Sequence, residues 1–124
     1  MSKPKKLLLV MEAVGHGDLL PLFQAPEYEA GMEVSARRGM ARLRNDPPDI
    51  LIANLHKRHF HDRVSNLESL LAAASRNPAT RIIILYDPLH AADMALLKRR
   101  HRIDAALPLP VSASMLQLAV SAST

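Results

Sequence analysis

The chain has 124 residues, a length that suits a single domain with its own hydrophobic core. It has no cysteine, which excludes disulfides and thiolate zinc sites, and only 3% of its residues are aromatic, which disfavours a stacking platform for single-stranded nucleic acid. The formal net charge of +4 permits contact with an acidic partner or with phosphates.

The first part of the chain predicts a buried strand followed by an interrupted helix. Residues 1–6 are basic and predict a flexible tail. The continuous aliphatic run Leu7–Met11 is typical of a strand covered on both faces in a parallel sheet. A helix is expected over Asp18–Glu29, where Pro21 suits a first turn but Pro26 is incompatible with a helix interior. We therefore expect a short or broken first helix.

The remaining elements alternate between strand and helix. Ile50–Ala53 and Ile82–Tyr86 are aliphatic runs without polar alternation, and they again predict buried parallel strands. Ser112 is a candidate N-cap of the last helix. In chain order, the predictions are a weak strand Met32–Ala36, helix Ala36–Arg44, strand Ile50–Ala53, helix Val64–Ser75, strand Ile82–Tyr86, helix Ala91–Arg102, strand Asp104–Leu107 and helix Ser112–Ser121.

This alternation predicts a doubly wound α/β fold. We expect one domain over residues 1–124, with a five-stranded parallel sheet, helices on both faces and a functional site at the carboxyl ends of the strands. No apolar run approaches the roughly 20 residues of a membrane helix, and the basic start is not followed by a signal-peptide pattern. The sequence therefore predicts a cytoplasmic protein with no membrane partner.

Five short motifs occur in an order and spacing that are typical of a known family. They are the aliphatic run Leu7–Val10, Gly31-Met32-Glu33-Val34 before Ala36, Pro48-Asp49 leading into Ile50–Leu55, Ile82–Leu85, and Leu107-Pro108-Leu109-Pro110. Together, over about Lys5 to Val120, they resemble the response-regulator receiver domain, the CheY-like phosphoacceptor module of bacterial two-component signalling. The resemblance implies a flavodoxin-like sheet with strand order 2-1-3-4-5, and a lysine followed by a cis-peptide proline after the fifth strand.

The residues that perform the family's chemistry are replaced. The resemblance places the Mg²⁺-binding acidic pair at Met11 and Glu12, and the phosphoacceptor aspartate at Asn54. It places the hydroxyl residue after strand four at Tyr86, and the lysine that contacts the phosphoryl group at Leu109. A neutral amide is a poor nucleophile, a single carboxylate is a weak Mg²⁺ site, and leucine supplies no cation. We therefore expect a pseudo-receiver without a phosphorylation site, a cofactor or enzymatic activity.

The most unusual local segment is His56–Asp62, directly after the third predicted strand. Its histidines His56, His59 and His61 are weak candidates for binding Zn²⁺, Ni²⁺ or Cu²⁺. No cysteine joins them and several basic residues oppose a nearby cation, so no metal site is predicted. A polar loop, or a pH-sensitive or phosphate-binding loop, is the alternative.

A domain without chemistry of its own acts through contacts. We expect an interaction or dimerisation module in bacterial signal transduction or transcriptional regulation, either the N-terminal domain of a longer regulator or a stand-alone adaptor. The partner is then a protein or a second copy, and nucleic acid would be contacted only through a separate output domain. In receiver domains the face of helix four, strand five and helix five commonly carries such contacts, and here that region contains Lys98, Arg99, Arg102 and Asp104. The alternative is a nucleic-acid or nucleotide-phosphate binder that uses basic patches at Arg37, Arg38, Arg42, Arg44 and Lys98–Arg102.

Overall fold

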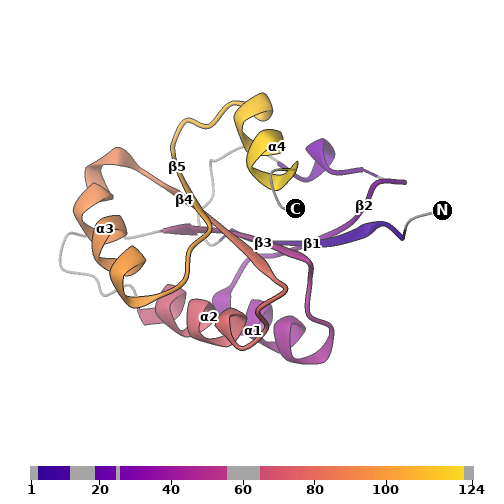
Figure 1. Cartoon of the computed structure of the whole chain (residues 1–124), viewed down its shortest axis with the longest axis horizontal. Helices are drawn as coiled ribbons and strands as arrows, with labels where there is room; N and C mark the ends of the chain where they lie inside the picture. The colour runs from indigo at the N-terminus through magenta and orange to yellow at the C-terminus, as the bar shows by residue number, and fades with distance from the viewer. Residues whose placement is uncertain (1–2, 12–18, 25, 56–64, 122–124) are drawn as a thin grey trace.

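The computed structural model describes residues 3–11, 19–24, 26–55 and 65–121 (Figure 1). At its centre is a parallel sheet of five strands in the order β2-β1-β3-β4-β5. The strands are β1 (Lys5–Val10), β2 (Tyr28–Glu33), β3 (Ile50–Leu55), β4 (Arg81–Tyr86) and β5 (Ala105–Pro108). The five-stranded doubly wound sheet and its strand order are therefore confirmed.

The described residues contain four α-helices and two short 3₁₀ helices. They are η1 (Leu20–Leu22), α1 (Ala36–Asn45), α2 (Ser65–Ser75), η2 (Pro88–His90), α3 (Ala91–Arg100) and α4 (Ala113–Ser121). Figure 1 shows α1 and α2 together on one side of the sheet and α4 on the other. None of the helices in the described ranges is both long and apolar enough to cross a membrane.

Two apolar layers hold the helices against the sheet. Leu8 and Val10 of β1 belong to the layer that packs against α1, α2 and α3. Leu7 and Leu9 belong to the opposite layer, which includes residues of α4 and Phe23 after η1. Every residue of the central strand β3 is buried. Because both faces of the sheet are covered, the central strands β3 and β4 consist mainly of aliphatic runs and need no polar alternation.

The N-terminal strand starts earlier than predicted. β1 begins at Lys5, so Lys5 and Lys6 belong to the sheet, and the predicted tail over residues 1–6 is wrong for these two positions. The backbone N–H of Lys6 donates to the Asp49 carboxylate at 2.8 Å. The side-chain ammonium of Lys6 lies 2.6 Å from the Asp46 carboxylate. This hydrogen bond to Asp46 raises the pKa of Lys6 above its ordinary value of 10.5. The ammonium of Lys6 therefore stays charged at neutral pH, and on the alkaline side the ion pair is lost as the pH rises through the raised pKa.

The second strand and the first helix also differ in position from the prediction. β2 ends at Glu33, which pairs with the last residue of β1, Val10, and the predicted strand Met32–Ala36 is wrong beyond that point. The chain must turn there because Ser35 caps α1, accepting a hydrogen bond from the Arg38 N–H at 3.3 Å. The expected short first helix is confirmed in part by the 3₁₀ helix η1, which has a proline in its first turn. The predicted range Asp18–Glu29 is wrong at its end, because Tyr28 and Glu29 belong to β2.

Gly39 marks a close approach of α1 to the sheet, and it gives a stability prediction. A methyl group added at Gly39 would lie 2.8 Å from Cγ2 of buried Val10. We expect Gly39→Ala to lower the free energy of unfolding by about 1 kcal/mol, because overpacking costs more than the gain in helix propensity. Urea denaturation followed by circular dichroism measures this change.

Gly31→Ala is the matched control for that prediction. The nearest atom to its added methyl group is Nη1 of Arg42 at 2.5 Å, the end of a flexible side chain that can move away. We expect this variant to be as stable as the wild type within about 0.5 kcal/mol. A similar loss in both variants would contradict the close-packing explanation.

Candidate functional site

The residues aligned with the family's phosphorylation site meet at the carboxyl edge of the sheet. Met11 follows β1, Asn54 is next to last in β3, and Tyr86 ends β4. Leu109 follows β5, and its N–H donates to the Tyr86 carbonyl at 2.8 Å. The Leu109–Pro110 peptide bond is cis, as the family resemblance implies. Glu12 lies outside the described residues.

Strand alternation places these side chains on two different faces. Asn54 follows Ile52 by two residues, so its side chain points to the face covered by α4. Met11 and Leu109 pack in the apolar layer of that same face. Tyr86 packs against the opposite layer, beneath α1, α2 and α3. The structure therefore brings Met11, Asn54 and Leu109 to one side of the sheet and separates Tyr86 from them.

The surroundings of Asn54 are poorly suited to anions. Asn54 is 2% exposed and Met11 is 8% exposed, while Leu109 is partly buried. Mg²⁺ prefers hard, mostly anionic oxygen ligands, and a phosphoryl group needs cations or aligned N–H donors. Met11 and Leu109 offer neither, and the Asn54 amide is neutral. Among the described residues, these three side chains offer no charge that would offset the desolvation of an ion beside them.

The histidine cluster contributes nothing to this description. His56, His59 and His61 lie outside the described residues, so the expectation that they form no metal site stays a prediction.

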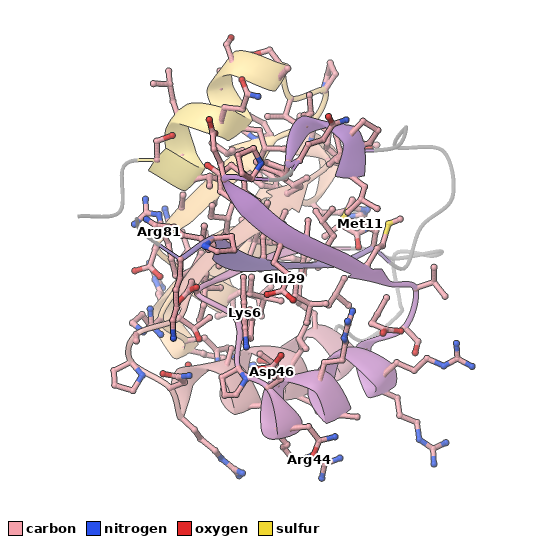
Figure 2. The ribbon with its side chains drawn as sticks, turned by 90° about the vertical axis from the view of Figure 1, so that its right-hand side faces the viewer. Lys6, Met11, Glu29, Arg44, Asp46 and Arg81 are labelled. Carbon is pink, nitrogen blue, oxygen red and sulfur yellow. The ribbon has the colours of Figure 1, made fainter. Side chains whose placement is uncertain are left out.

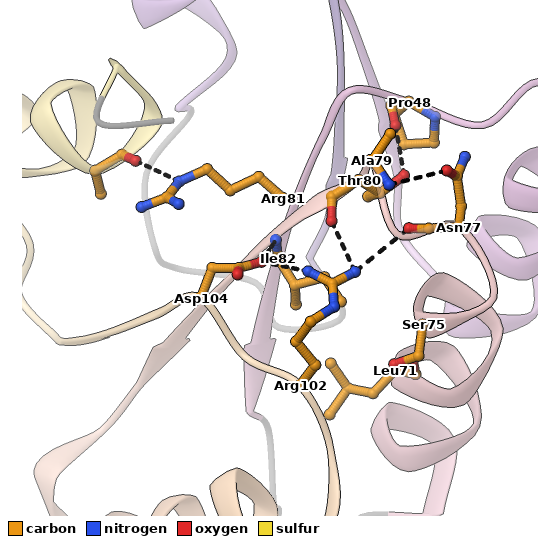
Figure 3. Close-up of polar contacts among 11 residues, drawn as sticks. Pro48, Leu71, Ser75, Asn77, Ala79, Thr80, Arg81, Ile82, Arg102 and Asp104 are labelled. Carbon is orange, nitrogen blue, oxygen red and sulfur yellow. Dashed lines mark hydrogen bonds and ion pairs between the residues drawn. The ribbon is translucent and has the colours of Figure 1, made fainter. Parts of the chain in front are cut away.

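Two of the four candidate interface residues form a network at the amino edge of the sheet (Figure 3). Nη1 of Arg102 lies 2.7 Å from the Asp104 carboxylate. Its Nη2 donates to the backbone carbonyls of Thr80, at 2.9 Å, and Asn77, at 3.3 Å. The same oxygen of Asp104 accepts the N–H of Ile82 at 2.7 Å. Arg102 and Asp104 therefore connect the segment before β5 to the start of β4.

Sequence reasoning missed this role because it assigned Arg102 to the end of a helix. The helix α3 ends at Arg100, and Arg102 lies in the segment that follows. Lys98 and Arg99 occupy the last turn of α3 and are exposed. Only these two of the four candidate interface residues are left without such a network in the described part of the chain.

The basic clusters are partly neutralised within the chain. Arg42 lies 3.5 Å from Glu33, and Arg100 lies 3.3 Å from Glu68. Figure 1 shows α1 and α3, which carry the two clusters, at separate places along the sheet. This arrangement does not favour a single continuous phosphate-binding patch.

No family model matches the sequence, and no curated protein matches it. Several solved structures have a similar fold. The CheY-like receiver domain protein from Methanospirillum hungatei JF-1 has a TM-score of 0.78 at 16% identity, covering 96% of this chain and 92% of that one. The signal receiver domain of an HD domain-containing protein from Pseudomonas fluorescens Pf-5 has a TM-score of 0.76 at 21% identity, covering 97% and 94%.

A third similar structure is NtrX from Brucella abortus in complex with ADP, with a TM-score of 0.76 at 15% identity. The similarity covers 96% of this chain but only 26% of NtrX, so the same fold occurs there as one part of a longer protein. At these identities the likeness concerns the fold, and it agrees with the observed strand order. The chain therefore has the flavodoxin-like fold of CheY-like response-regulator receiver domains.

Proposed function

We propose that the chain is a receiver-like regulatory domain of bacterial signalling that acts through protein contacts and is not phosphorylated at Asn54. The proposal rests on one observation, a buried asparagine that shares its side of the sheet with Met11 and Leu109. An intact site needs a carboxylate nucleophile there, with a metal and a cation beside it. In this proposal the domain has no enzymatic activity and needs no cofactor.

The surface that includes α3, β5 and α4 supports the contact part of the proposal. α4 has no charged residue, and it exposes 49% of Met115 and 69% of Leu118, three residues apart on one helix face. Leu96 of α3 is also exposed, close in sequence to the cations Lys98 and Arg99. Exposed aliphatic side chains on an uncharged helix are more stable when a protein partner or a second copy of the chain covers them than when they contact water.

Treatment with phosphoryl donors tests the proposal. The protein is incubated with acetyl phosphate and Mg²⁺, and separately with beryllofluoride and Mg²⁺, beside a receiver domain with an intact acceptor aspartate. Intact-mass spectrometry is expected to detect a phosphoryl adduct only on that control. Backbone amide NMR is expected to show no saturable shifts at Met11, Asn54 or Leu109. An adduct on this chain, or saturable shifts at these residues, would contradict the proposal.

A further inference from the structure

A groove between α1 and α2 combines an apolar floor with a basic rim. Its volume is about 680 Å³. The floor includes Met40, Leu43 and Ala73, and the rim includes Arg37, Arg44 and Arg76. In Figure 2, Arg44 projects from α1 on the side away from the sheet. Because α1 and α2 cover the face opposite to the Asn54 side chain, this groove is separate from the degenerate phosphorylation site.

The arginines are spaced along the groove. Arg37 and Arg44 are seven residues apart on α1, which is two helical turns and about 10 Å along the axis. Residues with this spacing lie on the same face of a helix. Arg44 is in the last turn of α1, and Arg76 directly follows α2. The rim therefore presents one cation at the start of α1 and two cations at the helix ends.

Contacts within the described part of the chain do not account for these three cations. Arg42 and Arg100 have carboxylate partners, whereas Arg37, Arg44 and Arg76 have no ion pair with any described residue. The first turn of α1 contains no acidic residue. A cation in a first turn is opposed by the helix dipole, so Arg37 does not serve the stability of its own helix.

We propose that this groove binds an acidic amphipathic helix of a partner protein. Aliphatic side chains of that helix would cover the floor, and two carboxylates seven residues apart would meet Arg37 and Arg44. This is the helix-in-groove mode of peptide recognition. Nucleic acid fits less well, because the floor is aliphatic and no lining residue is aromatic. The inference goes beyond the proposed function and does not depend on the state of Asn54.

A synthetic helical peptide with the pattern Glu-x-x-Leu-Leu-x-x-Glu is the probe. Its fluorescein-labelled form is titrated with the protein and followed by fluorescence anisotropy. We expect micromolar binding that weakens with added salt, since the rim charges are exposed. A peptide with lysine in place of both glutamates is expected not to bind. Absence of binding by the glutamate peptide would overturn the proposal, as would equal binding of the lysine peptide.

Substitutions locate the binding on the molecule. Arg37→Ala with Arg44→Ala should weaken binding about tenfold, while the matched charge change Lys98→Ala with Arg99→Ala on α3 should leave it unchanged. Ala72 also lines the groove, and Ala72→Glu should abolish binding because it places a carboxylate there beside those of the peptide. Ala72 is exposed and glutamate is a good helix former, so circular dichroism should confirm an unchanged fold.

Two results would overturn the assignment of the groove. An equal loss of binding in both double variants would mean that the peptide responds to overall charge alone. Displacement of the peptide by a single-stranded DNA oligonucleotide, with Ala72→Glu having no effect on DNA binding, would identify the rim as a nucleic-acid contact. Neither result would bear on the phosphorylation test, which concerns the opposite face of the sheet.

Discussion

Replacing Asp104 with alanine is expected to lower the free energy of unfolding by about 2–3 kcal/mol. The substitution removes the oxygen that accepts the Ile82 N–H at 2.7 Å, and Ile82 is fully buried. A buried donor without an acceptor costs about 1–3 kcal/mol. Arg102 also loses its carboxylate partner, which adds no more than about 1 kcal/mol because the pair is partly exposed. Urea denaturation followed by circular dichroism measures the sum.

Two further variants separate these contributions. Asp104→Asn keeps an oxygen that can accept the Ile82 N–H, and we expect it to lose about 1 kcal/mol. Arg102→Ala keeps the acceptor but removes the ion pair and the bonds to two carbonyls, and a similar loss of about 1 kcal/mol is expected. Stability of Asp104→Ala within about 0.5 kcal/mol of the wild type would show that the network does not hold β4 and β5 in register.

The stability of the Asp104 variants decides which substitutions can test the surface that includes α3, β5 and α4 as an interaction surface. A loss of partner binding in an Asp104 variant would be ambiguous, because the fold itself is weakened. Lys98 and Arg99 are exposed and take no part in the network, so their substitution reports on a partner without this effect. The structure thus separates four exposed residues into Arg102 and Asp104, which take part in the network, and Lys98 and Arg99, which do not.

The sheet could be predicted because strands that are buried on both faces have aliphatic sequences without polar alternation. β3 and β4 are buried between two layers of side chains, and most of each strand is an aliphatic run, Ile50–Ala53 and Ile82–Leu85. β2 lies at the edge of the sheet and mixes exposed with half-buried residues, so its limits could not be read from composition. Its end at Glu33 is set by pairing with β1 and by the Ser35 cap, which are tertiary and local backbone effects.

The candidate site could be predicted from the sequence only in part. Motif spacing predicted that Met11, Asn54, Tyr86 and Leu109 stand at the strand ends, where the structure has them. It did not predict that Tyr86 packs on the other face, because both faces of β4 are covered and no polar alternation distinguishes them in the sequence. The groove between α1 and α2 was not predicted, because Arg44 and Arg76 are far apart in sequence and meet only when the two helices pack.

Replacing Asn54 with aspartate is expected to lower the free energy of unfolding by about 2–4 kcal/mol at neutral pH. The new carboxylate would occupy a 2% exposed position on the side of the sheet where Met11 and Leu109 pack. Burial disfavours its charged form, so its pKa in the folded protein would rise above the unfolded value of about 3.9. The folded state then holds the proton to higher pH than the unfolded state.

The sign of the pH dependence follows from this difference in proton binding. Below about pH 4 the carboxyl is neutral in both states, and Asn54→Asp should be close to wild type in stability. As the pH rises from there towards the raised pKa, the unfolded state releases its proton first and the variant loses stability. Thermal unfolding of both proteins between pH 4 and pH 8, followed by circular dichroism, measures the growing gap.

A second substitution connects this stability effect with the lost chemistry. Leu109→Lys, added to Asn54→Asp, supplies a cation on the same side of the sheet and should recover part of the stability at neutral pH. Leu109→Lys alone should not stabilise the wild type, because the Asn54 amide has no charge to pair with. If Asn54→Asp is instead as stable as the wild type at every pH, the surroundings of residue 54 already accommodate an anion. The proposal of a domain that works without phosphorylation would then lose its physical basis.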